Sequence, residues 1–332
     1  MNNRRKLLVA LGASTIATPL VSFAQQRAVP PLVISLQTRS ADSQTPRQRA
    51  WFEAFRTGLR ENGLVEGRDL KLETMHAEGH YERLPELARK VVQRSPSVIL
   101  TQSTDTVIAA HGATKSIPIV ALAMNNPLEL GFAASLARPG GNVTGLISEP
   151  GDREAKLIEV LHDALPIVKR VAVLADPKYP RASAVLEQMQ AYAKARGIVL
   201  LPVFVSDAAQ IEPGLSAAFN QGAQALVALR FNLLASTGVK VVAFSNSHRV
   251  PAIYGYQELA DEGGLIGYGT NVANLYRRAA WYVARILRGA KPGELPIEQP
   301  TTFELVVNMK TAKTLGVKIP NAILARADRV IE

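Results

Sequence analysis

The chain alternates short runs of aliphatic and β-branched residues with longer segments of helical period. In the first half, the expected strands are 32–36, 70–74, 98–101, 119–121 and 143–146, and the expected helices are 46–62, 84–93, 104–113 and 128–136. Parallel strands need crossover connections of this length, and they are apolar throughout because helices cover both faces of their sheet. The pattern therefore predicts a doubly wound α/β sheet.

The same pattern starts again after residue 170. Its expected strands are 171–174, 198–203, 225–229, 252–254 and 265–268, and its expected helices are 181–196, 208–220 and 236–247. Since 332 residues are too many for one compact domain, two such sets in tandem predict two lobes of similar architecture. The tail has a long amphipathic helix at 274–288, a loop with Gly and Pro, a strand at 303–307 and a final short helix, and we expect it to cross between the lobes.

The first 24 residues are typical of a signal peptide. Arg4, Arg5 and Lys6 precede a mostly apolar stretch at 7–17, and 22–24 (Ser-Phe-Ala) supplies the small residues that a signal peptidase needs. About 11 apolar residues are too few to cross a bilayer core of roughly 30 Å. The chain has no cysteine, which excludes a lipid-anchored Cys and disulfides. We expect cleavage near Ala24 and release into the periplasm, by general secretion or, through Arg4-Arg5, by twin-arginine export.

The basic charge does not predict nucleic-acid binding. Removing Arg4, Arg5 and Lys6 lowers the formal net charge from +10 to +7, and the remaining Lys and Arg residues are scattered. No dense basic run and no basic patch interleaved with aromatic residues is present in the sequence. We interpret the charge as a contribution to solubility and to attraction toward anionic surfaces, and we expect a monomer without a nucleic-acid partner.

In doubly wound sheets, ligands bind beyond the carboxyl ends of the strands. In the first lobe, these turns hold small polar candidates: Thr38, Thr101, Gln102, Ser103, Thr104, Asn125 and Asn126. Ser103 and Thr104 lead directly into a helix, where they either hold an anionic oxygen of a ligand or only cap that helix. Asp105 in the same turn would repel an anion.

The matching turns of the second lobe carry aromatic side chains. The candidates are Tyr179, in the turn that begins with Asp176, then Phe231 after Arg230, Tyr254 and Tyr268. An aromatic surface opposite hydroxyl and amide groups suits a small amphipathic solute, although each ring taken alone could instead be a core residue. The sequence thus predicts a binding cleft between the lobes.

No catalytic, cofactor or metal motif is found in the sequence. The five histidines lack metal-type spacing, and there is no G-x-S-x-G, no phosphate-binding G-x-x-x-x-G-K-[ST] and no G-x-G-x-x-G after the first strand. We therefore predict binding without catalysis, and no cofactor or metal.

Motifs in order along the mature chain carry a family resemblance. They are 58–63 (GLRENG) with 66–67 (EG), 77–79 (AEG) with Tyr81, 83–85 (RLP), 117–120 (IPIV), 136–145 (LARPGGNVTG), 251–254 (PAIY), 263–269 (GGLIGYG), 286–292 (ILRGAKP) and 299–308 (QPTTFELVVN). The chain resembles the periplasmic solute-binding proteins of an ABC transporter family with the type I periplasmic-binding-protein fold. The resemblance implies three crossovers, a solute held in the cleft, hinge closure and delivery to an inner-membrane permease.

Placement in this family divides the chain into a signal peptide at 1–24, lobe 1 at 25–147 plus 269–299, and lobe 2 at 148–268 plus 300–332. It also adds Thr144, in the 136–145 motif, to the candidate ligand contacts. Some relatives are associated with aromatic amino acids. Two departures bear on the ligand: Asn126 stands where relatives often have Asp, so it offers a ligand ammonium only a dipole, and 176–179 reads Asp-Pro-Lys-Tyr where Asn-Pro is common.

Three functions compete at this point. A transport receptor captures an amino-acid-like solute for an ABC permease, whereas a sensory module of the same fold hands a signal to a membrane receptor; neighbouring permease and ATPase genes would favour the first. A secreted enzyme would need a nucleophile, base or metal that the sequence does not display.

Overall fold

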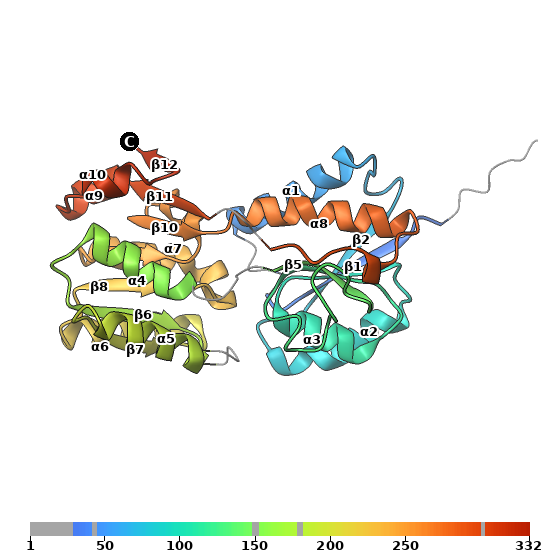
Figure 1. The fold of residues 1–332 in the computed structure, drawn as a ribbon, viewed down its shortest axis with the longest axis horizontal. Helices are drawn as coiled ribbons and strands as arrows, with labels where there is room; N and C mark the ends of the chain where they lie inside the picture. Colours follow the sequence, from blue (N-terminus) through green and yellow to red (C-terminus); the bar gives the residue numbers. More distant parts are fainter. Residues whose placement is uncertain (1–28, 42–44, 148–152, 178–181, 300–302) are drawn as a thin grey trace, which may run out of the picture. The chain divides into compact units, whose positions relative to one another are not determined.

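The computed structural model describes residues 29–41, 45–147, 153–177, 182–299 and 303–332. Within these ranges, the strands form two sheets whose pairs are parallel with one exception (Figure 1). Helices pack on both sheets, so the predicted fold of two doubly wound α/β lobes is confirmed. None of the described helices has the length and apolar composition needed to span a bilayer.

Lobe 1 is built on a five-stranded sheet of order β2-β1-β3-β4-β5. Its strands are β1 (Leu32–Gln37), β2 (Lys71–His76), β3 (Val98–Thr101), β4 (Ile119–Met124) and β5 (Val143–Ile147). Its helices are α1 (Pro46–Glu61), η1 (Tyr81–Arg83), α2 (Leu84–Gln93), α3 (Thr104–Ala113), α8 (Val272–Leu287) and the single turn η4 (Pro292–Glu294).

Alternating side chains of this sheet enter two cores because successive strand residues point to opposite faces. Leu100 belongs to the core beneath α1 and α8, and its neighbour Ile99 to the core beneath α2 and α3. Helices α1 and α8 lie side by side (Figure 1). Gly58 permits this close approach, since a Cβ there would meet the carbonyl oxygen of Arg277 and lie 2.8 Å from the Cβ of Ala280.

Lobe 2 is built on a seven-stranded sheet of order β12-β11-β10-β9-β8-β6-β7. Its strands are β6 (Arg170–Ala175), β7 (Val199–Phe204), β8 (Ala225–Ala228), β9 (Ala252–Tyr254), β10 (Ile266–Gly269), β11 (Glu304–Asn308) and β12 (Arg329–Ile331). Its helices are α4 (Arg153–Ala164), α5 (Ala182–Lys194), η2 (Ala208–Gln210), α6 (Ile211–Asn220), α7 (Asn232–Ser247), η3 (Gln257–Ala260), α9 (Met309–Leu315) and α10 (Asn321–Leu324). The antiparallel pair is β10 with β11.

The chain passes between the two sheets three times. The first passage leads from β5 to α4, and the second leads from β10 to α8. The third leads to β11 from Glu298, whose backbone is hydrogen-bonded to that of β5. Residues Pro31–Glu332 form one compact unit.

The structure departs from the sequence-based expectations at four elements. The segment 128–136 is a series of turns and not a helix, because Gly131 takes a left-handed φ of 70° and Phe132 inserts into the core beneath α2 and α3. Helix α4 and strand β12 were not predicted. Helix α7 begins at Asn232, four residues earlier than expected, which brings the side chain of Asn232 to the carboxyl end of β8.

Candidate functional site

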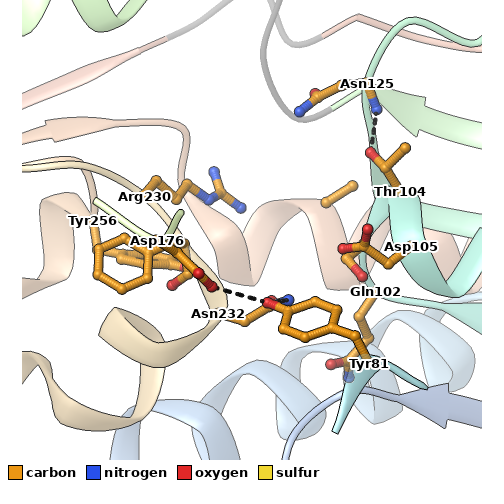
Figure 2. Close-up of a pocket in the computed structure, with 12 residues that line it drawn as sticks. Tyr81, Gln102, Thr104, Asp105, Asn125, Asp176, Arg230, Asn232 and Tyr256 are labelled. Carbon is orange, nitrogen blue, oxygen red and sulfur yellow. Dashed lines mark hydrogen bonds between the residues drawn. The ribbon is translucent and has the colours of Figure 1, made fainter. Parts of the chain in front are cut away.

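A pocket opens where the loops after the strands of both lobes meet. Its lining residues are Tyr81, Gln102, Ser103, Thr104, Asp105, Ala123, Asn125, Asp176, Arg230, Phe231, Asn232 and Tyr256 (Figure 2). We call it the interlobe pocket. It lies at the carboxyl ends of β3 and β4 in lobe 1 and of β6, β8 and β9 in lobe 2, which is where doubly wound sheets bind ligands.

The lobe 1 wall is a helix N-terminus whose cap is already formed. Ser103 is the N-cap of α3, and its hydroxyl accepts from the backbone N–H of Thr106 at 3.5 Å. The hydroxyl of Thr104 accepts from the backbone N–H of Asn125 at 3.0 Å, which ties the loops after β3 and β4 together (Figure 2). The Ser103 hydroxyl also lies 3.4 Å from Oγ1 of Thr106, whereas the Thr104 hydroxyl can still offer its hydrogen to a ligand.

Tyr81 of η1 connects this wall to lobe 2. Its hydroxyl donates to Oδ2 of Asp176 at 3.4 Å and accepts from Nδ2 of Asn232 at 3.0 Å (Figure 2). Burial raises the pKa of the Tyr81 phenol, so the hydroxyl keeps its proton at neutral pH. A neutral side chain of one lobe is thus hydrogen-bonded to two residues of the other.

Charges of both signs line the interlobe pocket. Asp105 comes from the first turn of α3 and Asp176 from the turn after β6; burial raises the pKa of Asp105, and the charge of Asp176 raises it further. Arg230 follows β8, donates to Oγ1 of Thr270 at 2.7 Å and places its guanidinium 5.1 Å from the ring centre of Tyr256. The pocket can therefore meet a cationic group and an anionic group of one small molecule.

The approach of Arg230 depends on Gly255. A Cβ at Gly255 would lie 2.8 Å from the backbone nitrogen of Arg230 and 3.1 Å from its Cβ, closer than side chains tolerate. The residue between β9 and Tyr256 must therefore lack a side chain.

A second compartment adjoins the interlobe pocket and shares part of its lining. Beyond the shared residues, it is lined by Arg39, Trp51, Leu122, Ala235, Val272, Leu275 and Tyr276. We call it the aromatic compartment. Arg39 donates to Oε1 of Gln102 at 2.5 Å and to the hydroxyl of Tyr276 at 3.2 Å, while Nε2 of Gln102 is buried without a partner in the described structure.

The structure brings five of the predicted residues into the interlobe pocket: Gln102, Ser103, Thr104, Asn125 and Phe231. Thr38 lines a neighbouring hollow with Glu78 and Ser206. Tyr179 lies outside the described residues.

Five other predicted residues do not line the interlobe pocket. The hydroxyls of Thr101 and Thr144 donate to carbonyl oxygens, of Val120 at 3.4 Å and of Leu295 at 2.8 Å, and both side chains are buried in the sheet. Asn126 donates to Glu129 at 2.7 Å, Tyr254 is fully buried, and Tyr268 stacks on Phe303 with ring centres 6.0 Å apart.

Seven pocket residues were missed as candidates: Ala123 and the polar residues Tyr81, Asp105, Asp176, Arg230, Asn232 and Tyr256. Asp176 and Arg230 stand in the very turns that the strand-end rule selects, so charge in those turns was a usable signal. Asp105 was considered only as a residue that would repel an anion. Tyr81 and Tyr256 gave no such signal, since η1 follows no strand directly and Tyr256 lies beyond a glycine turn.

The described part of the chain contains no group of three or more His, Cys, Asp or Glu side chains placed to hold a metal ion. Two doubly wound lobes with three passages and a pocket at their strand ends define a binding protein of the type I periplasmic-binding-protein fold. The model of the family described as ABC transporter substrate binding protein matches residues 44–331, and the chain belongs to this family. The family consists of solute-binding receptors that are typically extracytoplasmic.

Individual relatives agree with this assignment. A tyrosine-binding protein of Clostridioides difficile is 24% identical over 267 residues, which cover 80% of this chain and 76% of that protein. A conserved domain protein of Vibrio cholerae superposes with a TM-score of 0.80 at 28% identity, covering 90% of this chain and 99% of that one. An ABC domain from Streptococcus pneumoniae, solved in complex with L-Trp, superposes with a TM-score of 0.77 at 24% identity, covering 90% and 100%.

Proposed function

We propose that this protein captures a zwitterionic, aromatic amino-acid-like solute in the interlobe pocket and delivers it, chemically unchanged, to an ABC permease. The observation that carries this proposal is the pairing of opposite charges with aromatic rings in one pocket: Asp105 and Asp176, Arg230, and the rings of Tyr81 and Tyr256. An ammonium group binds against the two carboxylates, and a carboxylate binds toward Arg230. The rings cover the apolar part of the solute.

Two acidic residues of the pocket can replace the Asp that relatives often have at the position of Asn126. Asn126 cannot pair ionically with an ammonium, and its side chain is directed to Glu129. Asp105 and Asp176 supply the missing negative charge from two different lobes. The name of the tyrosine-binding relative supports an aromatic side chain on the solute.

The remaining parts of the proposal rest on the sequence and on its resemblance to the family. Residues 1–24 direct export and are removed, the mature monomer works in the periplasm, and the permease lies in the inner membrane. Lobe 1 comprises 25–147 plus 269–299, and lobe 2 comprises 148–268 plus 300–332. No nucleic acid, cofactor or metal takes part.

A ligand screen tests the proposal. The protein is unfolded and refolded to remove any copurified solute, and its melting temperature is measured with L-tyrosine, L-phenylalanine, L-leucine, tyramine and 3-(4-hydroxyphenyl)propionate. A ligand at a hundredfold excess over Kd stabilises the folded state by about 2.7 kcal/mol. We expect the aromatic amino acids to raise the melting temperature most, because tyramine lacks the carboxylate and the propionate lacks the ammonium.

Isothermal titration with Asp176→Asn and Arg230→Gln then assigns the two charges. Each variant should bind L-tyrosine at least tenfold more weakly, while Asp163→Asn, which alters an exposed ion pair with Arg326 in lobe 2, should bind normally. If no amino acid in the panel shifts the melting temperature, the proposed ligand class is wrong.

A further inference from the structure

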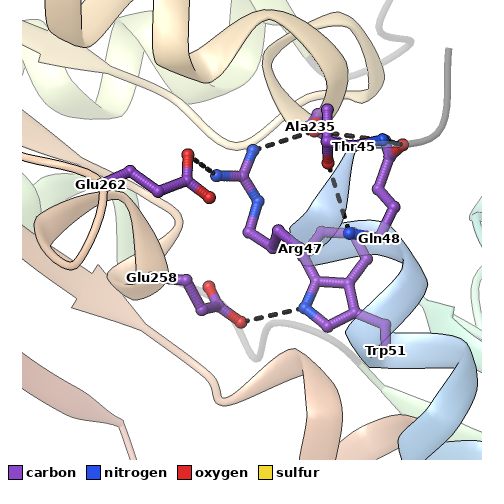
Figure 3. A network of polar contacts seen from close by, with 7 residues as sticks. All are labelled: Thr45, Arg47, Gln48, Trp51, Ala235, Glu258 and Glu262. Carbon is purple, nitrogen blue, oxygen red and sulfur yellow. Dashed lines mark hydrogen bonds and ion pairs between the residues drawn. The ribbon is translucent and has the colours of Figure 1, made fainter.

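The first turns of α1, in lobe 1, are bonded to lobe 2. Nη2 of Arg47 and Nε2 of Gln48 both donate to the backbone carbonyl of Ala235 in α7, at 2.9 and 3.2 Å, and Nη1 of Arg47 pairs with Glu262 at 2.5 Å (Figure 3). Gln48 is held for this contact by its capping box with Thr45. The start of α1 therefore has a fixed position against lobe 2.

One turn further along α1, Trp51 is bonded to a buried carboxylate. Its indole N–H donates to Oε1 of Glu258 at 3.2 Å (Figure 3). The same oxygen accepts from the backbone N–H of Val272 at 3.4 Å. Val272 is the first residue of α8 and follows the second passage between the sheets. Glu258 of lobe 2 thus joins two helices of lobe 1 at one point and fixes the plane of the indole.

The indole packs on a residue of the interlobe pocket. Trp51 stacks on Tyr256 with ring centres 5.8 Å apart and an interplanar angle of 27°. The guanidinium of Arg47 lies 5.8 Å from the ring centre of Trp51 and 5.9 Å from that of Tyr256. On its pocket side, Tyr256 meets Arg230. The ring of Tyr256 is therefore held between an indole of lobe 1 and the interior of the pocket.

We propose that Trp51 is a positioning residue for solute binding, which acts by fixing the ring of Tyr256 in the pocket wall and is itself oriented by Glu258. This inference rests on the proposed function. Without Trp51, the side chain of Tyr256 can rotate about its side-chain bonds. Solute binding must then immobilise this ring, and the lost conformational entropy reduces the affinity. Loss of Trp51 should weaken solute binding even though the residue belongs to the opposite lobe from Tyr256.

A double-mutant cycle with L-tyrosine as the probe tests this role. We expect Trp51→Leu to weaken binding about tenfold, and Trp51→Phe, which keeps a stacked ring, to stay within threefold of the unmodified protein. In the Tyr256→Leu background, Trp51→Leu should cause no further loss, because the residue through which it acts is gone. Additive losses would overturn the proposal and assign Trp51 a direct contact or a general structural role.

The second tryptophan, Trp281 on α8, provides a matched control. Trp281→Leu makes the same chemical change outside the lining of both compartments and should leave the affinity unchanged whatever its effect on the melting temperature. In a Trp281→Phe protein, Trp51 is the remaining tryptophan, and its emission on excitation at 295 nm reports its surroundings. Glu258→Leu should alter this emission and weaken binding, whereas Glu258→Gln keeps an acceptor oxygen and should restore both.

The outcomes separate the two proposals. Normal L-tyrosine binding by a folded Trp51→Leu protein would overturn the positioning role and leave the proposed function intact. Failure of the unmodified protein to bind any aromatic amino acid would overturn the proposed function, and the positioning role with it.

Discussion

Asp105 and Asp176 reach the same pocket from two different sheets, and the charge on Asp176 adds to the effect of burial in raising the pKa of Asp105. Two carboxylates that desolvate and repel one another are costly in an empty pocket. A cationic ligand group placed between the two carboxylates would relieve this cost.

We predict that Asp105→Asn stabilises the unliganded protein at pH 7. The pKa of Asp105 is raised in the folded state, so its contribution to stability is complete below the unfolded pKa of about 3.9 and is lost as pH rises through the folded pKa. Asparagine carries no charge and avoids this loss. Urea unfolding at pH 7 and at pH 4 should show an advantage of the variant that shrinks at the lower pH; an advantage that grows on acidification would contradict the charge argument.

Removing the Tyr81 hydroxyl should weaken the connection between the lobes. Tyr81→Phe leaves Asp176 and Asn232 without this partner at a partly buried site, which should lower the free energy of unfolding by about 1–2 kcal/mol. Chemical denaturation at pH 7 measures this loss. Tyr192→Phe on α5, away from the pocket, is the control. Equal losses of unfolding free energy in the two variants would show that the hydrogen bonds of Tyr81 to Asp176 and Asn232 do not stabilise the fold.

Gly255→Ala should impair binding through Arg230. The new Cβ would press on the backbone of Arg230 and shift its guanidinium from the pocket, so we expect both a lower melting temperature and at least tenfold weaker L-tyrosine binding. Gly112→Ala is the control, because a Cβ at Gly112 meets nothing within 4 Å and the residue lies in a helix, where alanine is favoured by up to about 1 kcal/mol. Normal binding by Gly255→Ala would show that Arg230 does not need its present position.

Removing one partner of the Arg47–Glu262 ion pair should destabilise the fold more than replacing both partners. The side chain of Arg47 is 4% exposed and that of Glu262 24%, so Glu262→Gln leaves a buried guanidinium short of its counter-charge and should destabilise the fold by about 2 kcal/mol. Combining it with Arg47→Met should recover part of this loss, since the buried charge is then absent as well. Melting temperatures of both single variants and the double variant test this order; a double variant that is less stable than both would contradict it.

Hydrophobic periodicity was enough to predict every described strand except β12, and most helices, because parallel strands buried on both faces leave long apolar runs in the sequence. It failed at 128–136, where apolar residues fill a series of turns, and at α4, whose apolar positions were not recognised as helical. The strand-end rule selected Gln102, Ser103, Thr104, Asn125 and Phe231 correctly as pocket-lining residues. Their role in binding stays a prediction.

The same rule misplaced residues by one or two positions. Thr101 and Tyr254 still belong to their strands, so their side chains pack in the sheet, whereas Gln102 and Tyr256 lie just beyond the strand ends and reach the pocket. Thr144, which the family resemblance had added, is also buried in its strand. Successive strand residues point to opposite faces, so an error of one residue in the predicted strand end can exchange a buried side chain for one that reaches the pocket. Strand ends predicted from sequence carry errors of at least this size. The partners of Tyr81 and Trp51 belong to the other lobe and depend on how the chain folds back, which local patterns do not contain.

The close packing of α1 against α8 also has a consequence for synthesis on the ribosome. Helix α1, with Gly58 at its contact surface, is synthesised early. Helix α8, which packs on that surface, follows more than 200 residues later, after most of lobe 2 has left the ribosome. A nascent chain that ends before α8 would expose the apolar face of α1 to solvent, and its lobe 1 would lack one of the helices that cover the sheet. Lobe 1 can therefore complete its co-translational folding only after α8 has been synthesised, near the end of translation.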